Sequence, residues 1–269
     1  MQVQINALVW TLMGCAVFMV GTMALQRWYG VKLGWQPLVA GLRATLQLAA
    51  LSLILAGVFQ VGWTAFLFVA LMITVASVTS ARRVGDLPWG RCAAPIAIAS
   101  TAVLVITMVF LLRMLDFSTS NLIAVGGIVT GNCMSAATLT GRRFGQEARS
   151  SRGQVEGWFA LGATPAIAYR EVARQSITEM LIPKLDQTKN TGLVTLPGAF
   201  VGALMGGAVP VQAARFQLVV LISIMFAQTL VGIIETRILS RATTVPADPQ
   251  RVESKEPDKK PLLTRHWKK

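Results

Sequence analysis

The chain is poor in the residues that carry most enzyme chemistry. It has one histidine and three cysteines among 269 residues. Cys15, Cys92 and Cys133 form no CxxC pair, so the sequence indicates neither a zinc site nor a redox motif. It also lacks a GxxxxGK[ST] loop for the phosphates of ATP, an HExxH motif and a GxSxG motif. We therefore expect a chain that has no catalytic residues and does not hydrolyse ATP by itself.

Charged residues are scarce too, at 14%, whereas 54% of the residues are apolar. This composition is unlike that of a soluble domain. Apolar stretches reach about 20 residues, the length that a helix needs to cross a bilayer. We predict an all-α, multi-pass membrane protein with about seven spans: 5–25, 38–58, 63–80, 93–112, 121–140, 192–211 and 216–239. The sixth span is the weakest, because it is rich in glycine.

Lysine and arginine are concentrated in every second loop between the predicted spans. The odd-numbered loops and the C-terminal tail hold almost all of them, and the even-numbered loops hold almost none. Because cytoplasmic loops carry the excess of basic residues, the N-terminus is predicted outside and the C-terminus in the cytoplasm, in a plasma (inner) membrane. Topology and contact with anionic lipid headgroups then explain the net charge of +13, and no nucleic-acid partner is expected.

The chain divides into one predicted transmembrane domain, 1–240, and a tail, 241–269. The tail carries four prolines among mixed charges and few apolar residues. Such a segment buries too little apolar surface to fold, so we predict disorder. A docking segment for a partner is the alternative.

A polar segment, 142–190, interrupts the hydrophobic spans on the basic side of the membrane. Its first part, 154–161, suits a short amphipathic helix that Gly162 ends. Thr164 is then a candidate N-cap, and Pro165 the first residue of a second helix that runs to about residue 180. One interpretation is an amphipathic hairpin that lies on the bilayer surface. The other is a docking segment for a soluble partner.

Several motifs in and around this segment favour the second interpretation. Glu156 precedes Gly162 by six residues, as in the EAA loop of ABC transporter permeases. The run LGATP at 161–165 is followed by LIP at 181–183, then Asp186 and Lys189, then GLV at 192–194 and LPG at 196–198. This pattern resembles the FetB family of iron-export ABC permeases, and the likeness extends from the second span to the end of the seventh.

The resemblance implies a permease subunit that works as a homodimer with two copies of a separate ABC ATPase. That partner would bind ATP and Mg, and this chain would bind no cofactor. Iron or another metal is the implied cargo. Plant members are tied to aluminium tolerance, so an organic cargo such as a nucleotide sugar remains open. The residues implied to couple the chain to the ATPase are Glu156, Leu161, Gly162, Ala163, Thr164 and Pro165.

Candidates for the cargo pathway are polar or sulfur-containing residues in or near the spans, because polar groups at that depth tend to face a cavity. They are Arg43, Gln47, Asn132, Cys133, Met134, Glu179, Asp186 and Lys189. Most of them also have a structural alternative. Arg43 can extend to the lipid interface, Asn132 can bond between helices and Met134 can pack in the core. The last three, predicted at the cytoplasmic mouth, can form ion pairs. No set of metal ligands is identified.

Small residues in the sixth predicted span form a doubled GxxxG pattern. Gly198, Gly202 and Gly206 are spaced by four, and Pro197 is expected to bend or break the helix before them. Packing within one chain, a dimer seam and a moving gate all remain open.

Two other classes compete with the ABC permease. A secondary transporter would need an acidic ion site near the membrane centre and inverted repeats, and neither is evident. A membrane anchor or sensor would use the same polar segment without any cavity, and export against a gradient would distinguish the two.

Overall fold

The computed structural model describes the backbone of residues 2–58 and 62–246, and the side chains of 10–54 and 62–246. The chain forms two compact units, one ending at Gly62 and the other beginning at Trp63. Helices make up almost all of the described residues, and the only β pairing among them is an isolated bridge between Thr191 and Thr195. The prediction of an all-α protein is therefore confirmed.

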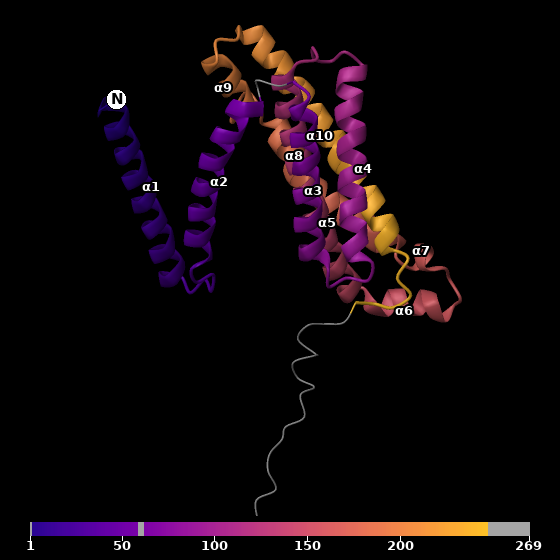
Figure 1. Ribbon diagram of the computed structural model, residues 1–269. Helices are drawn as coiled ribbons and strands as arrows, with labels where there is room; N and C mark the ends of the chain where they lie inside the picture. The colour runs from indigo at the N-terminus through magenta and orange to yellow at the C-terminus, as the bar shows by residue number, and fades with distance from the viewer. Residues whose placement is uncertain (1, 59–61, 247–269) are drawn as a thin grey trace, which may run out of the picture. The chain divides into compact units, whose positions relative to one another are not determined.

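The first unit is a pair of helices, α1 (Gln2–Trp28) and α2 (Gln36–Val58), joined by a short loop. Near the loop, the side chain of Met19 closes on Gly41. The guanidinium of Arg27 lies 5.3 Å from the ring centre of Trp35, a cation–π contact. Towards their other ends the two helices diverge (Figure 1).

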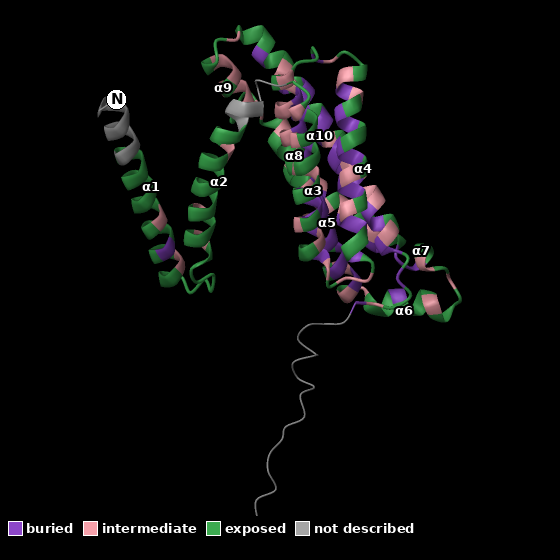
Figure 2. Ribbon diagram, in the orientation of Figure 1, coloured by how far each residue is buried: buried purple, intermediate pink, exposed green. Residues whose placement is uncertain are grey.

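The second unit is a bundle whose centre is formed by α5 (Thr119–Ser150) and α10 (Pro210–Leu239). Around them pack α3 (Thr64–Val84), α4 (Gly90–Leu111) and α8 (Arg170–Lys189). Two short helices, α6 (Arg152–Ala160) and α7 (Pro165–Ala168), lie at one end, which we call the elbow end (Figure 1). The opposite, far end holds α9 (Gly198–Met205) and the N-termini of α5 and α10. Figure 2 shows the buried residues concentrated where these helices face one another.

Glycines set the close approach of α3 to α5. The side chain of Val69 on α3 lies against Gly126 on α5, and Val84 lies against Gly141, fifteen residues further along both helices. Between these two contacts, the hydroxyls of Ser80 and Thr138 are 3.3 Å apart and form a hydrogen bond. The two helices are thus parallel and in register over about 22 Å. Small residues that let helix backbones approach closely are typical of packing inside membranes.

Five helices among the described residues are long and apolar enough to cross a membrane: α2, α3, α4, α5 and α10. They correspond to the second, third, fourth, fifth and seventh predicted spans. α5 continues ten residues beyond the predicted span 121–140, into the polar segment. The count of seven spans and the orientation of the termini remain predictions.

The sixth predicted span, 192–211, is wrong as a single helix. Only the eight residues of α9 are helical within it before α10 begins, and Pro197 precedes α9 instead of bending it. Gly198 and Gly202 have open space where a Cβ would stand, and Gly206 is the C-cap. α9 itself contacts α10, but among the residues that the structure describes Gly198 and Gly202 do not form that contact. The segment that runs along α5 and α10 is instead α8, which is polar in sequence.

The tail prediction is corrected in part. Ala242 and Pro246 are buried, so residues 241–246 pack against the bundle. The rest of the predicted tail lies outside the described residues.

The glycine contacts of α5 yield a stability prediction. A Cβ at Gly141 would overlap the side chain of Val84 and come within 3.1 Å of Oε1 of Glu235, whereas a Cβ at Gly131 would meet nothing within 4 Å. Gly141→Ala should lower the free energy of unfolding by about 1–3 kcal/mol, because the helices must move apart. The matched Gly131→Ala should leave stability unchanged or raise it, because alanine favours helix. Thermal unfolding of the purified protein in detergent measures both, and equal effects would contradict the packing.

Candidate functional site: the elbow and a polar pocket

The elbow, residues 152–168, consists of α6, a sharp turn and α7 across one end of the bundle (Figure 1). Gly162 makes the turn at φ +79°, a value that glycine adopts without steric cost. The amide of Ala163 donates to the carbonyl of Trp158 and that of Gly162 donates to Phe159, both at 3.0 Å. These two bonds form a Schellman motif, so the predicted helix end at Gly162 is confirmed.

The beginning of the second elbow helix differs from the prediction. Thr164 has the extended backbone of an N-cap, but its side chain makes no capping bond. Pro165 is the first helical residue, as predicted. The helix does not run unbroken to residue 180: it stops at Tyr169, and α8 then begins at Arg170. The elbow therefore ends in a second bend.

The outer surface of the elbow is apolar. Leu161 is 81% exposed, and Trp158 and Ile167 are about half exposed. Glu156 is exposed as well and pairs with Arg152 one turn earlier at 2.6 Å. A shallow recess of about 220 Å³ separates α6 from α7 and the start of α8, with Trp158 and Ile167 on its walls. Unpaired apolar side chains beside such a recess are typical of surfaces that bind another protein.

Tyr169 fixes the inner side of the elbow to the bundle. It is fully buried, and its hydroxyl donates to the carbonyl of Thr244 at 3.0 Å. Its ring lies 5.5 Å from that of Phe144 on α5 and 6.0 Å from that of Phe159 on α6. Burial raises the pKa of the phenol, which therefore remains a hydrogen-bond donor at neutral pH. Tyr169 thus joins α5, the elbow and the segment that follows α10.

The cluster around Tyr169 is apolar and contains residues of six helices, α4, α5, α6, α7, α8 and α10, and of the segment that follows α10. Its buried members are Ala93, Phe144, Ala148, Val155, Ala168, Tyr169, Val172, Leu239 and Ala242. Tyr169 was not among the residues predicted from the sequence. The signal for it was its place in the polar segment, because it is one of only two tyrosines in the chain.

A polar pocket of about 190 Å³ lies between α5, α8 and α10. Asn132 and Gln228 line it, and the Gln228 amide nitrogen donates to Oδ1 of Asn132 at 3.4 Å. On the α8 side, Nζ of Lys184 donates to Oε1 of Gln187 at 2.9 Å. The predicted interhelical hydrogen bond of Asn132 is therefore present, at the edge of a pocket that the sequence did not reveal.

The other cargo candidates of α5 do not line this pocket. Cys133 is fully buried in the bundle, and Met134 is half-buried. Successive residues of a helix point about 100° apart, so Asn132, Cys133 and Met134 face different neighbours. Arg43 and Gln47 are exposed on α2, in the first unit.

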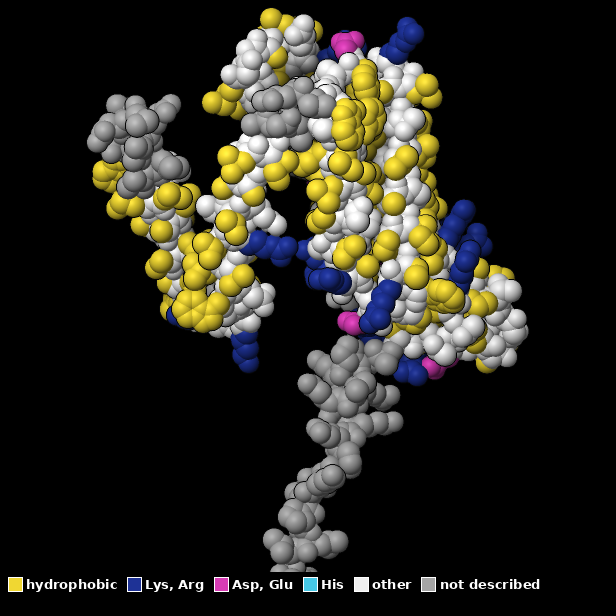
Figure 3. Space-filling view, viewed as in Figure 1, with side chains coloured by type: hydrophobic (Ala, Val, Ile, Leu, Met, Phe, Trp, Pro, Cys, Tyr) yellow, Lys and Arg dark blue, Asp and Glu magenta, His cyan; other side chains and the backbone are white. Residues whose placement is uncertain are grey.

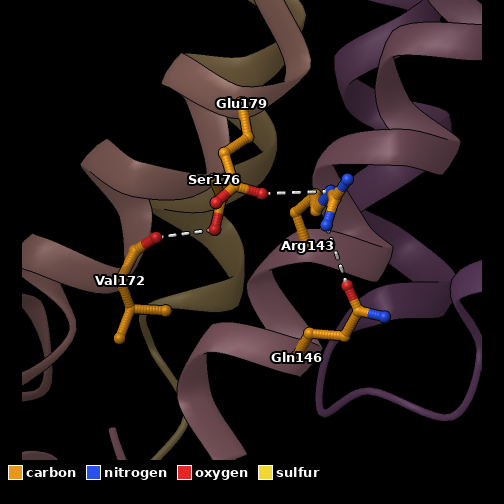
Figure 4. A network of polar contacts seen from close by, with 5 residues as sticks. All are labelled: Arg143, Gln146, Val172, Ser176 and Glu179. Carbon is orange, nitrogen blue, oxygen red and sulfur yellow. Dashed lines mark hydrogen bonds and ion pairs between the residues drawn. The ribbon is translucent and has the colours of Figure 1, made fainter. Parts of the chain in front are cut away.

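The three charged candidates on α8 form ion pairs. Arg143 on α5 binds Glu179 at 3.1 Å and reaches Gln146 at 3.5 Å (Figure 4). Asp186 and Lys189 pair with each other at 3.8 Å. They lie sixteen and nineteen residues after Arg170, where α8 begins at the elbow, so about 24–28 Å of helix separates them from it. The structure therefore separates Asp186 and Lys189 from the elbow, whereas the sequence placed both in one cytoplasmic segment; their place at the cytoplasmic mouth stays a prediction.

Acidic and sulfur ligands do not gather in the described part of the chain, where no group of three or more His, Cys, Asp or Glu residues could hold a metal. One buried acid was overlooked: Glu235 on α10 is fully buried beside Gly141, and neither carboxyl oxygen has a hydrogen-bond partner. It lies four residues before the end of α10 and is the one acid in the seventh predicted span.

Basic side chains, lysine and arginine together, gather near the elbow end of the second unit on the face shown in Figure 3. Arg82 and Arg83 lie in the last turn of α3, Arg91 lies in the first turn of α4, and Arg149 lies in the last turn of α5. This distribution agrees with the charge pattern that predicts the elbow in the cytoplasm.

Comparison with known proteins identifies relatives of the whole membrane domain. Residues 9–243 match the model of an uncharacterised protein family, UPF0014. The UPF0014 membrane protein STAR2 of Oryza sativa subsp. japonica is 34% identical over 74% of this chain and 70% of its own length. The protein ALUMINUM SENSITIVE 3 of Arabidopsis thaliana is 32% identical over 72% of each.

A bacterial relative has a name that states a transport role. The probable iron export permease protein FetB of Escherichia coli strain K12 is 34% identical over 52% of this chain and 54% of its own length. No solved structure matches. The predicted resemblance to the FetB family and to plant aluminium-related proteins is confirmed, and the chain belongs to the UPF0014 family of multi-pass membrane proteins.

Proposed function

We propose that this chain is the permease subunit of an ABC exporter, and that its elbow binds a separate ATPase subunit. The observation that carries the proposal is the two-sided elbow. Leu161, Trp158 and Ile167 face outward without a partner in the chain, while Tyr169 holds the inner side against the bundle. An apolar surface of this kind is stabilised when a partner covers it. A push or pull on α6 would then reach α5 and α8 through Tyr169.

The partner supplies the chemistry that this chain lacks. The sequence has no phosphate-binding loop, so ATP and Mg would be held and hydrolysed by the ATPase. The proposed assembly is a homodimer of this chain with two ATPase copies. Glu156 to Pro165 would form the contact, with Glu156 and Arg152 as its charged rim.

Iron is the first candidate cargo, because a relative is named as a probable iron export permease. The polar pocket favours a second candidate, an organic or anionic cargo. Lys184, Gln187, Asn132 and Gln228 offer one cation and three amides and no carboxylate, thiol or imidazole. Divalent iron prefers carboxylate, thiol and imidazole ligands, whereas a lysine and amides suit an anion that accepts hydrogen bonds.

The direct test is ATP hydrolysis by this chain co-purified in lipid with its ATPase. Ferrous iron, other divalent cations and a set of organic anions are added in turn. An exporter of iron should be stimulated by iron alone. Stimulation by an anion, lost in Lys184→Met, would assign the cargo to the polar pocket. If no ATPase co-purifies, the proposed function is wrong.

A matched pair of glycine variants tests the elbow in the same assay. Gly162→Ala forces an alanine into the left-handed region at a cost of about 1–2 kcal/mol, so it should distort the turn and reduce cargo-stimulated hydrolysis. Gly157 lies inside α6 and has open space where a Cβ would stand, so Gly157→Ala should leave cargo-stimulated hydrolysis unchanged. If cargo stimulates ATP hydrolysis normally in both variants, the turn does not transmit movement of the ATPase.

A second prediction concerns the buried hydroxyl. Tyr169→Phe removes the bond to Thr244, which should cost about 0.5–1.5 kcal/mol of stability and loosen the elbow. Basal hydrolysis should persist while stimulation by cargo falls. The exposed Tyr29, changed to Phe in the same way, is the control and should alter neither. A Tyr169→Phe protein with full stimulation would show that the hydroxyl is not needed for coupling.

A further inference from the structure

A groove between α3 and α4 has polar groups at one end and apolar walls along the rest. Its volume is about 690 Å³. Arg82 and Arg91 stand at the end near the α3–α4 turn, together with Asp86. Beyond them the walls are mainly apolar, and they include Ile73 and Ala99. The groove plays no part in the elbow or the polar pocket.

The polar end of the groove has a net positive charge. Arg82 and Arg91 are exposed, and among the described residues neither forms an ion pair; the same holds for Asp86. Two guanidinium groups and one carboxylate leave a net charge of +1. Clustered arginines at the end of membrane helices attract anionic lipid headgroups, because each adds to the attraction near the surface.

A second polar feature lies deeper in the groove. Ser77 lines it, is more than nine-tenths buried, and its Oγ has no hydrogen-bond partner. A buried hydroxyl without a partner costs free energy, so a ligand oxygen that accepts a hydrogen bond from it would be favoured there. Ser77 precedes Arg82 by five residues, which places it about 7–8 Å further into the bilayer along the helix.

The wall opposite Ser77 also has a spare polar group. Pro95 lies inside α4 and lines the groove. It has no N–H, so the carbonyl of Arg91 loses its usual helical donor. The groove therefore offers charge at its mouth, one hydroxyl below the mouth and apolar walls beyond. A phospholipid has the same order of groups: a phosphate, then ester carbonyls, then an acyl chain.

We propose that this groove binds an anionic phospholipid. The phosphate lies between Arg82 and Arg91, and a headgroup hydroxyl donates to the carboxylate of Asp86. Ser77 donates to an ester carbonyl, and one acyl chain lies over Ile73 and Ala99. The bound lipid sits beside the turn that joins α3 to α4, at the same end of the bundle as the elbow. This site is separate from the proposed contact with the ATPase.

The test measures lipid retained by the purified full-length chain. The protein is exchanged into nanodiscs that contain equal phosphatidylglycerol and phosphatidylethanolamine, extracted, and weighed by native mass spectrometry. The wild type should retain phosphatidylglycerol in preference. Arg82→Gln and Arg91→Gln should each weaken retention about fivefold, and the double variant about thirtyfold. Arg237→Gln is the control: it removes the same charge from the last turn of α10, at the elbow end of the bundle, and should not weaken retention.

A groove-filling variant separates the groove from general surface attraction. Ala99→Trp keeps both arginines but fills the apolar part, so it should abolish retention while thermal unfolding confirms that the protein is folded. Equal retention of the two lipids would overturn the proposal. So would retention that survives Ala99→Trp, because the lipid would then be held by surface charge alone. Absence of retained lipid in the wild type would mean that protein fills the groove, which also overturns it.

Discussion

Tyr169 fastens the elbow to the bundle, because its ring lies between Phe144 and Phe159 and its hydroxyl bonds to Thr244. Val155 of α6 and Ala168 of α7 are buried in the same cluster and hold the elbow to the bundle as well. Because these side chains pack closely together, a displacement of α6 would press on the end of α5 and the start of α8. Under the proposed function, this buried side chain would carry force from the surface to the helices that surround the polar pocket.

Packing inside the bundle complements that attachment. Glycines at 126 and 141 bring α5 close to α3 over fifteen residues, and Gly232 lets Met180 and Ile177 of α8 approach α10. Tight contacts of this kind favour movement of helices as units, since small shifts would overlap side chains. The elbow is therefore connected to a stiff set of helices, and the polar pocket lies where α5, α8 and α10 meet.

The sequence predicted the helices whose signal is local. Long apolar runs placed α2, α3, α4, α5 and α10, and the positive φ of Gly162 followed from glycine chemistry. The prediction from sequence failed at α8, because a hydropathy pattern identifies only those helices of a membrane bundle that face lipid. α8 instead packs along α5 and α10, where Glu179 contacts Arg143 of α5. The apolar, glycine-rich segment after it was then mistaken for a span. Tyr169 and the pocket of Lys184 and Gln228 depend on contacts between distant segments, which one sequence does not reveal.

The central claim is that the elbow is the surface that touches an ATPase. A photo-crosslinking residue at position 161 tests it most directly, with one at position 193 as the control, because Leu161 and Leu193 are both highly exposed leucines and lie at opposite ends of the bundle. In membranes that contain both proteins, position 161 should cross-link to the ATPase and position 193 should not. Cross-links from position 161 to lipid alone, or from position 193 to the ATPase, would contradict the account.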